Sequence, residues 1–271
     1  MFTERDREKC ERLLDEYSVG RKFSRTQYRE LIHKYAASGH RLLDAGCGRY
    51  LEFSKELADN VHVFGVDLEP TLETHNQRSP FGVRGNLGQL PFPDNYFDLI
   101  ISRSVIEHLE DPSVVFREFH RVLKPGGRVI LSTPNKYDYV SVIARITPYS
   151  FHRKLASKTL QVSEDDVFPT LYRANTLSKL GKELRSAGFI QQELKAINHY
   201  PAYLMFSPLL FRLGILYEKI TSIHALRFLR GTLLAVFEKQ RAESRMERSV
   251  NENNRAVKER APSSDLHELS I

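Results

Sequence analysis

Apolar positions along this chain follow two spacings, one typical of helices and one typical of buried strands. Residues 1–22 and Thr26–Ala37 carry apolar side chains three and four positions apart, which predicts two amphipathic helices. Short apolar segments predict strands at residues 41–45, 61–67, 81–86, 97–102 and 128–132. The segment 97–102 contains the continuous apolar run Leu99-Ile100-Ile101, which is typical of a parallel strand covered on both faces.

Helix signals lie between these strands. Asp111 is expected to cap a helix that has Pro112 at its first position, and Asn175 to cap a last helix. That helix leads into a strand ending at Ile197. The alternation of strands and helices predicts right-handed βαβ units and an α/β, doubly wound, mostly parallel sheet.

The carboxyl-terminal third is expected to complete this fold. Tyr200–Phe206 is predicted as an antiparallel seventh strand, followed by helices over 207–220 and 225–237. The expected organisation is an N-terminal helix (1–23), a main domain (24–206) with an insertion at 136–172, a helical extension (207–240) and a tail. The tail, 241–271, is charged and poor in apolar residues, which predicts disorder.

A glycine turn follows the first predicted strand. Asp44, Gly46 and Gly48 lie between this strand and a helix-forming segment, and such a turn lets a ligand approach backbone N–H groups closely. Asp67 ends the next strand about 20 residues later, as expected for a carboxylate that binds ribose hydroxyls. Each feature alone also fits an ordinary turn or strand end. Together they predict a site for an adenosine-type cofactor at the carboxyl ends of the strands.

Five motifs in order then resemble one known family. They are Leu-Asp-Ala-Gly-Cys-Gly (43–48), Gly-Val-Asp (65–67), Leu-Pro-Phe-Pro-Asp-Asn-Tyr-Phe-Asp-Leu-Ile (90–100), Val-Ile-Glu-His-Leu-Glu-Asp-Pro (105–112) and Leu-Lys-Pro-Gly-Gly (123–127). The chain resembles the class I S-adenosylmethionine-dependent methyltransferases, in particular the type 11 group. The resemblance implies a Rossmann-like sheet of seven strands, with a lid insertion and C-terminal helices in this chain.

The resemblance also implies a cofactor site for S-adenosyl-L-methionine. Asp44, Gly46 and Gly48 would hold its amino-acid end, Asp67 its ribose, and Asn86 with Leu87 its adenine. Ser102 and Arg103 would line the methionine side. The full expected set is Asp44, Ala45, Gly46, Cys47, Gly48, Asp67, Leu68, Asn86, Leu87, Ser102 and Arg103.

Two positions depart from the family pattern. Tyr50 stands where a third glycine is common, so its ring could narrow the pocket or turn outward. Asn86 stands where an aspartate is common, but its amide oxygen can still accept a hydrogen bond from the adenine amine.

No fixed catalytic motif is expected for the general base, because methyl transfer depends on alignment of the acceptor and needs little covalent help from the protein. His108 follows the fourth strand beside the expected cofactor, although a structural role in its loop is the favoured alternative. His152 and Asp165 lie in the insertion 136–172, which we expect to cover the active site as a lid. Solvated surface charge is the alternative for both.

Composition limits the setting and the partners. Cys10 and Cys47 are the two cysteines, so no disulfide or zinc framework is expected, and no metal site. The N-terminus has no secretory signal pattern, and a cytoplasmic location is expected. The net charge of +6 permits an anionic partner. The helices over 207–240 could dock on the core, on a second copy in a homo-oligomer, or on a membrane interface.

Four functional hypotheses follow. The first is an S-adenosylmethionine-dependent methyltransferase that acts on a small, lipid-linked or sugar-linked acceptor, with oxygen favoured over nitrogen or carbon. The second is a non-catalytic cofactor-binding protein that uses the C-terminal helices for a partner or a membrane. A nicotinamide-dependent oxidoreductase is disfavoured, because Leu51 occupies the position of its third glycine. A nucleic-acid methyltransferase is also disfavoured, because the chain reads Ser102-Arg103-Ser104-Val105 where the Asn/Asp-Pro-Pro-aromatic signature of amino-group base methylation would stand.

Overall fold

The computed structural model describes residues 4–48, 57, 60–68, 81–147 and 168–241. Residues Met1–Lys239 form one compact unit, and residues 242–271 of the tail for which disorder is predicted lie outside the described residues. The first unit holds a seven-stranded sheet with the strand order β3-β2-β1-β4-β5-β7-β6. The strands are β1 (Arg41–Ala45), β2 (His62–Asp67), β3 (Phe81–Arg84), β4 (Phe97–Arg103), β5 (Leu123–Pro134), β6 (Phe189–Ile197) and β7 (Thr232–Lys239).

Strands β1 to β5 are parallel to one another, and β7 runs antiparallel to both β5 and β6. The carboxyl ends of β1, β2, β4, β5 and β6 therefore lie along one edge of the sheet, which we call the carboxyl edge. The predicted doubly wound, mostly parallel sheet of seven strands is confirmed.

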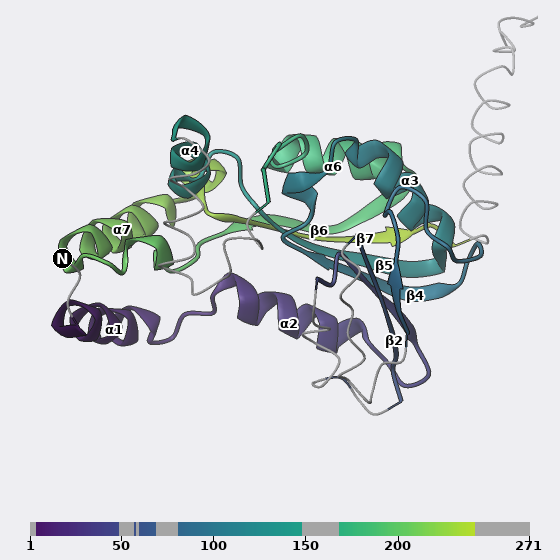
Figure 1. The fold of residues 1–271 in the computed structure, drawn as a ribbon, viewed down its shortest axis with the longest axis horizontal. Coiled ribbons are helices and arrows are strands. Elements are labelled where there is room, and N and C mark those ends of the chain that lie inside the picture. The colour runs from purple at the N-terminus through teal and green to yellow at the C-terminus, as the bar shows by residue number, and fades with distance from the viewer. Residues whose placement is uncertain (1–3, 49–56, 58–59, 69–80, 148–167, 242–271) are drawn as a thin grey trace, which may run out of the picture. The chain divides into compact units, whose positions relative to one another are not determined.

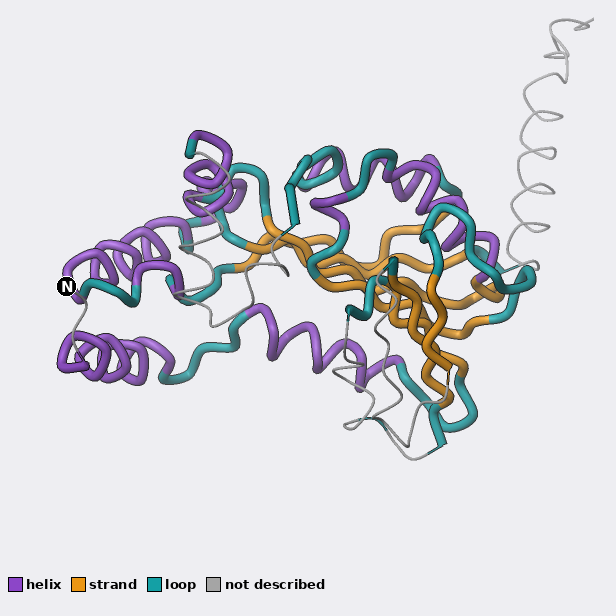
Figure 2. The backbone as a smooth tube through the Cα atoms, viewed as in Figure 1, coloured by secondary structure: helices purple, strands orange, loops and turns teal. Residues whose placement is uncertain are grey.

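Helices cover both faces of this sheet, as Figures 1 and 2 show. Helices α3 (Pro112–Val122) and α6 (Leu177–Ser186) lie on one face, and α2 (Ser24–Tyr35) lies on the other. Successive strand residues point to opposite faces, so Ile100 packs toward α3 while Leu99 and Ile101 pack toward α2. Burial on both faces explains the continuous apolar run at residues 99–101 of β4.

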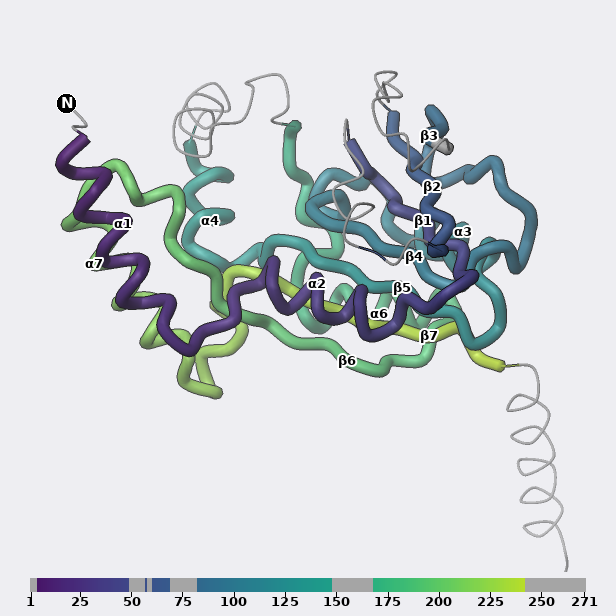
Figure 3. Tube along the Cα trace, turned by 90° about the horizontal axis from the view of Figure 1, so that it is seen from below, coloured from purple at the N-terminus to yellow at the C-terminus, as the bar shows by residue number. Residues whose placement is uncertain are grey.

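The remaining helices lie beyond the carboxyl edge. Helix α4 (Tyr139–Ile146) follows β5, and α7 (Pro208–Thr221) follows β6. Helix α1 (Glu4–Ser18) packs against α7, and Figure 3 shows the two side by side. Short 3₁₀ helices occupy Ile106–His108, Ala202–Leu204 and His224–Leu229. Among the described helices, none combines the length and the apolar composition that crossing a bilayer requires.

Three predictions about elements were wrong. Residues 200–206 contain a 3₁₀ turn and supply no strand, while the expected helix over 225–237 is a 3₁₀ turn followed by β7. The segment 207–240 therefore adds a strand to the sheet as well as a helix. The cap of α6 is Thr176, whose side chain accepts a hydrogen bond from the Lys179 N–H, and not Asn175. The predicted cap of α3 by Asp111, with Pro112 after it, is confirmed.

Candidate functional site

The glycine turn after β1 is held by backbone bonds to β2. The N–H groups of Gly46 and Cys47 both point to the Val66 carbonyl, at 2.8 and 3.3 Å. Gly46 and Gly48 have φ values of +78° and +61°, a region that residues with a Cβ rarely adopt. A Cβ on Gly46 would also overlap the side chain of Val105. The backbone can therefore follow this path only with glycine at position 46.

Asp67 lies against the same turn. Its Oδ2 accepts a hydrogen bond of 2.8 Å from the Gly48 N–H, which fixes the orientation of the carboxylate at the carboxyl end of β2. The turn and the acid that the sequence paired across 19 positions are thus adjacent in space. Asp44 is buried beside them, at the end of β1.

Cys47 is not a reactive thiol in this setting. Burial, followed by the neighbouring charges of Asp44 and Asp67, raises its pKa far above the ordinary value. The thiol therefore stays protonated at neutral pH, and Cys47 cannot act as a nucleophile there.

The other residues of the expected cofactor set lie at the same edge, in different environments. Ser102 is fully buried at the end of β4, and its Oγ donates to the Ala45 carbonyl at 2.7 Å. Asn86 is exposed after β3, and its Oδ1 accepts from the Gly88 N–H at 2.8 Å. Leu87 is buried, whereas Leu68 and Arg103 are exposed.

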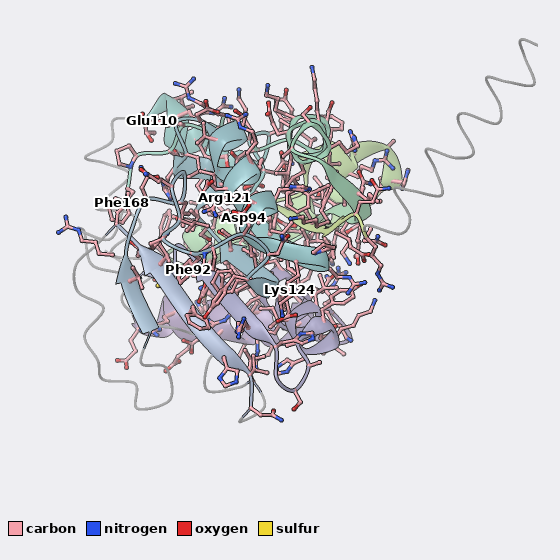
Figure 4. All side chains as sticks on the ribbon, turned by 90° about the vertical axis from the view of Figure 1, so that its right-hand side faces the viewer. Phe92, Asp94, Glu110, Arg121, Lys124 and Phe168 are labelled. Carbon is pink, nitrogen blue, oxygen red and sulfur yellow. The ribbon has the colours of Figure 1, made fainter. Side chains whose placement is uncertain are left out.

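The loop between β3 and β4 is fastened by one side chain of α3. Arg121 donates to the carbonyls of Leu90 and Phe92, and to the carboxylates of Asp94 and Glu118, over distances of 2.8 to 3.0 Å. Figure 4 shows Arg121 and Asp94 next to each other. A guanidinium can serve several acceptors at once because its five N–H groups form a planar fork. This clamp fixes the path of the Leu-Pro-Phe-Pro-Asp motif.

The turn after β4 holds the chain that returns from the insertion. The Glu107 carbonyl accepts from the N–H groups of Leu171 and Tyr172, at 2.7 and 3.1 Å. His108 Nδ1 lies 2.7 Å from the Pro169 carbonyl, and its ring packs edge-on against Phe168. Because a carbonyl can only accept, Nδ1 carries the proton in this bond, and Nε2 is left to accept or to bind a second proton.

The Glu107 side chain is a site residue that the sequence analysis missed. It is fully buried, Oε2 accepts from Thr133 Oγ1 at 2.8 Å, and Oε1 lies 3.9 Å from His108 Nε2. Burial raises the pKa of this carboxyl, against the opposing effects of His108 and Arg103. The signal available in the sequence was an acidic residue directly before a candidate histidine.

A cavity of about 630 Å³ adjoins this turn. It is lined by Glu110, Asp111, Pro112, Ser113, Lys136, Leu171, Tyr172, Arg173, Lys179 and Glu183. Three basic and three acidic side chains face it, so the cavity suits a charged or hydroxylated molecule better than an apolar one. His152, Asp165 and Tyr50 lie outside the described residues.

Comparisons with known proteins agree with this geometry. A family model described as a methyltransferase domain, type 11, matches residues 43–131. A probable S-adenosylmethionine-dependent methyltransferase of Mycolicibacterium smegmatis is 37% identical over 133 residues, which are 47% of this chain and 49% of the relative. Residues 43–131 are a methyltransferase domain of the type 11 group, and the chain is similar to S-adenosylmethionine-dependent methyltransferases.

Proteins similar to this chain differ in what they methylate. The ubiquinone/menaquinone biosynthesis C-methyltransferase UbiE of Vibrio cholerae is 30% identical over 154 residues, 52% of this chain and 58% of the relative. A phosphoethanolamine N-methyltransferase of Haemonchus contortus has the same fold, with a TM-score of 0.50 and 18% identity, over 80% of this chain and 53% of that one. The chain spans about half the length of the curated relatives it matches.

The described residues fit the cofactor of this class of methyltransferases. No described atom lies within 4 Å of the place where a Cβ of Gly48 would be, and the fixed Asp67 carboxylate lies beside this open turn at the carboxyl edge. This edge is where nucleotide-like ligands bind in open α/β sheets.

Proposed function

We propose that this protein is an active methyltransferase that uses S-adenosyl-L-methionine. The observation that carries the proposal is the Asp67 carboxylate, held by Gly48 against a turn that only glycine can form. Asp67 would bind the two ribose hydroxyls, Asp44 and the turn from Ala45 to Gly48 the methionine end, and Leu68, Asn86 and Leu87 the adenine end. Ser102 and Arg103 would border the reacting methyl group.

The cofactor, when bound, supplies a sulfonium whose methyl group is already electrophilic. The protein must then align an acceptor and, for a hydroxyl, remove its proton. We propose transfer to oxygen, with the Glu107–His108 pair taking the proton at the carboxyl end of β4. Glu107 is buried and His108 keeps Nε2 free to accept, which supports this role. His152 and Asp165 remain proposals of the same kind.

Titration calorimetry with S-adenosylhomocysteine tests cofactor binding. We expect one molecule to bind per chain, and Asp67→Asn to weaken binding at least about 30-fold, since it removes a charge-assisted pair of hydrogen bonds worth ~2 kcal/mol or more. Asp98→Asn is the control, because Asp98 binds Arg41 and Lys124 at the opposite edge of the sheet. Equal affinity of both variants, or no binding by the native chain, would contradict the proposal.

Cofactor binding without methyl transfer would distinguish a non-catalytic cofactor-binding protein from an active methyltransferase. A non-catalytic protein would bind S-adenosylhomocysteine normally but transfer no labelled methyl group to small-molecule, lipid or sugar fractions. The relatives do not decide the acceptor atom, since one is a C-methyltransferase and one structural neighbour an N-methyltransferase. Product analysis of the labelled acceptor decides it.

We also propose that the acceptor is lipid-linked and that α7 docks on an anionic membrane surface. Leu209 and Leu213 are 67% and 52% exposed on α7, and Leu216 and Ile220 continue the same stripe. The basic side chains of Arg212 and Lys219 are exposed on the same helix, as expected for contact with lipid phosphates.

Sedimentation with lipid vesicles tests this surface. We expect binding to phosphatidylglycerol-containing vesicles, and its loss in the variant Leu209→Glu/Leu213→Glu. Lys182→Glu on α6 is the control, because it changes the net charge by the same −2 at an exposed site. If Lys182→Glu weakens binding equally, the attraction is general electrostatics and the docking face is wrong.

A further inference from the structure

Three side chains from distant parts of the sequence meet beyond the carboxyl edge. They are Asp138, which caps α4, His199, which follows β6, and Glu218 of α7. One ligand-type atom from each lies within 4.8 Å of the other two. Figures 1 and 3 both show α4 and α7 at the same end of the sheet.

The two carboxylates of this cluster lack ordinary partners. Glu218 is fully buried, and neither of its oxygens has a hydrogen-bond partner among the described residues, although the His199 backbone N–H faces it. Asp138 is also buried; Oδ2 caps α4 by accepting from the Val140 N–H, while Oδ1 has no partner in the described part of the chain. Unpaired carboxylate oxygens are rare in protein interiors, because leaving water without a new partner costs free energy.

No basic side chain in the described residues forms an ion pair with either carboxylate. Two carboxyl groups are thus buried side by side, and a cation or bound protons must offset their negative charge. Burial raises the pKa of Asp138 to about 7 and that of Glu218 to about 8. The imidazole of His199 lies beside both carboxyl groups and offers a ring nitrogen as the third donor.

Gly231 makes room for the imidazole. A Cβ at this position, directly before β7, would overlap Nδ1 of His199. The ring can therefore occupy the space beside the carboxylates only while residue 231 has no side chain.

We propose that Asp138, His199 and Glu218 bind a divalent transition-metal ion, with Zn²⁺ or Mn²⁺ as the fitting ions. Two carboxylate oxygens and one imidazole nitrogen form a donor set that both ions accept. Ligand atoms of a tetrahedral zinc ion are about 3.4 Å apart at bonds of ~2.1 Å, so the side chains must move inward by about 1 Å. A bound ion would join α4 and α7 to the ends of β5 and β6.

Calorimetry on chelator-treated protein tests the site with Zn²⁺, Mn²⁺ and Mg²⁺ separately. We expect one Zn²⁺ or Mn²⁺ per chain, a higher melting temperature on binding, and weak binding of Mg²⁺. Glu218→Gln and Asp138→Asn should each lower the affinity at least about 30-fold. Asn still caps a helix, so Asp138→Asn keeps α4. Glu193→Gln, on the β6 strand, is the control and should bind as the native chain does.

Two results would overturn the proposal. One is that no ion binds; a buried carboxyl pair that shares a proton would then show a melting temperature that falls between about pH 4 and pH 8 and does not respond to metal. The other is binding that both variants retain, as expected for an ion held by Cys10, Cys47 or surface histidines. If Glu218→Gln does not fold, Gly231→Ala provides the second arm, since it displaces the imidazole while both carboxylates remain.

Discussion

Single residues at the carboxyl edge of the sheet show which site positions can be predicted from the sequence. Gly46, Gly48 and Asp67 were identified from their types and spacing, because a left-handed turn and a strand-terminal acid leave a local signature. Glu107 was missed, since its burial and its bond to Thr133 depend on β5, which follows it in the sequence. In a motif, a histidine is a more obvious candidate for the general base than the acidic residue before it.

Gly46 and Gly48 differ in the atoms that the Cβ of an alanine at each position would contact. Gly46→Ala should lower the free energy of unfolding by roughly 2–4 kcal/mol, because a left-handed φ and overlap with Val105 act together. Gly48→Ala meets no described atom within 4 Å, so only the cost of its φ, about 1–2 kcal/mol, applies. Urea unfolding of both variants measures the difference. Equal losses would mean that Val105 moves aside.

His108 can be tested without knowing the acceptor. His108→Ala removes the bond to the Pro169 carbonyl and the contact with Phe168, which together stabilise by about 1–2 kcal/mol. We expect faster hydrogen exchange at the amides of Leu171 and Tyr172, which bind the adjacent Glu107 carbonyl.

The amide of Leu180 in α6 serves as the internal reference for that exchange measurement. Unchanged exchange at Leu171 and Tyr172 would show that the turn after β4 holds the returning chain without the imidazole.

At the scale of elements, the sequence predicted the parallel strands well and the last strand poorly. Strands β1, β2 and β4 are short apolar runs that follow clear breaks. β7 was assigned to a helix because Leu226, Leu229 and Leu233 have helical spacing across Gly231. Apolar runs of this length do not distinguish helix from strand by periodicity. Only the pairing with β5 and β6 decides that residues 232–239 are extended.

Truncation tests the importance of β7. A chain ending at Arg241 should unfold at nearly the native temperature, because Met1–Lys239 is one compact unit. A chain ending at Arg230 lacks β7 and the Lys239 ammonium, which donates to Asn95 Oδ1 and to the carbonyls of His120 and Leu123. We expect it to be insoluble or to lack cooperative melting in calorimetry. Cooperative melting of that chain would show that β6 can leave the sheet without loss of the core.

At the scale of the whole molecule, two clusters lie at the carboxyl edge, and they differ in how far apart their residues are in the sequence. The glycine turn and Asp67 lie within 24 residues, so a motif could reveal them. Asp138, His199 and Glu218 are spread over 81 positions and converge only through β6 and α7. No spacing rule predicts such a cluster, and the sequence analysis expected no metal site.

The two clusters should respond independently to their ligands. In Asp67→Asn, S-adenosylhomocysteine should no longer raise the melting temperature, while the rise caused by Zn²⁺ remains. Glu218→Gln should show the reverse pattern, because the substituted side chain lies on α7 and not on β1 or β2. Differential scanning fluorimetry of the four combinations measures this. Loss of both responses in either variant would mean that the clusters are coupled or that the fold is damaged.

The position of β7 also governs the order in which the sheet can be completed during synthesis. Of the seven strands of this sheet, β7 leaves the ribosome last, yet its place is between β5 and β6. Until residues 232–239 emerge, β5 has an unpaired edge and β6 has no strand to join. The nascent chain therefore exposes two strand edges at once, and unpaired edges are sites of aggregation. Translation that slows before Thr232 should thus increase the dependence of this protein on chaperones.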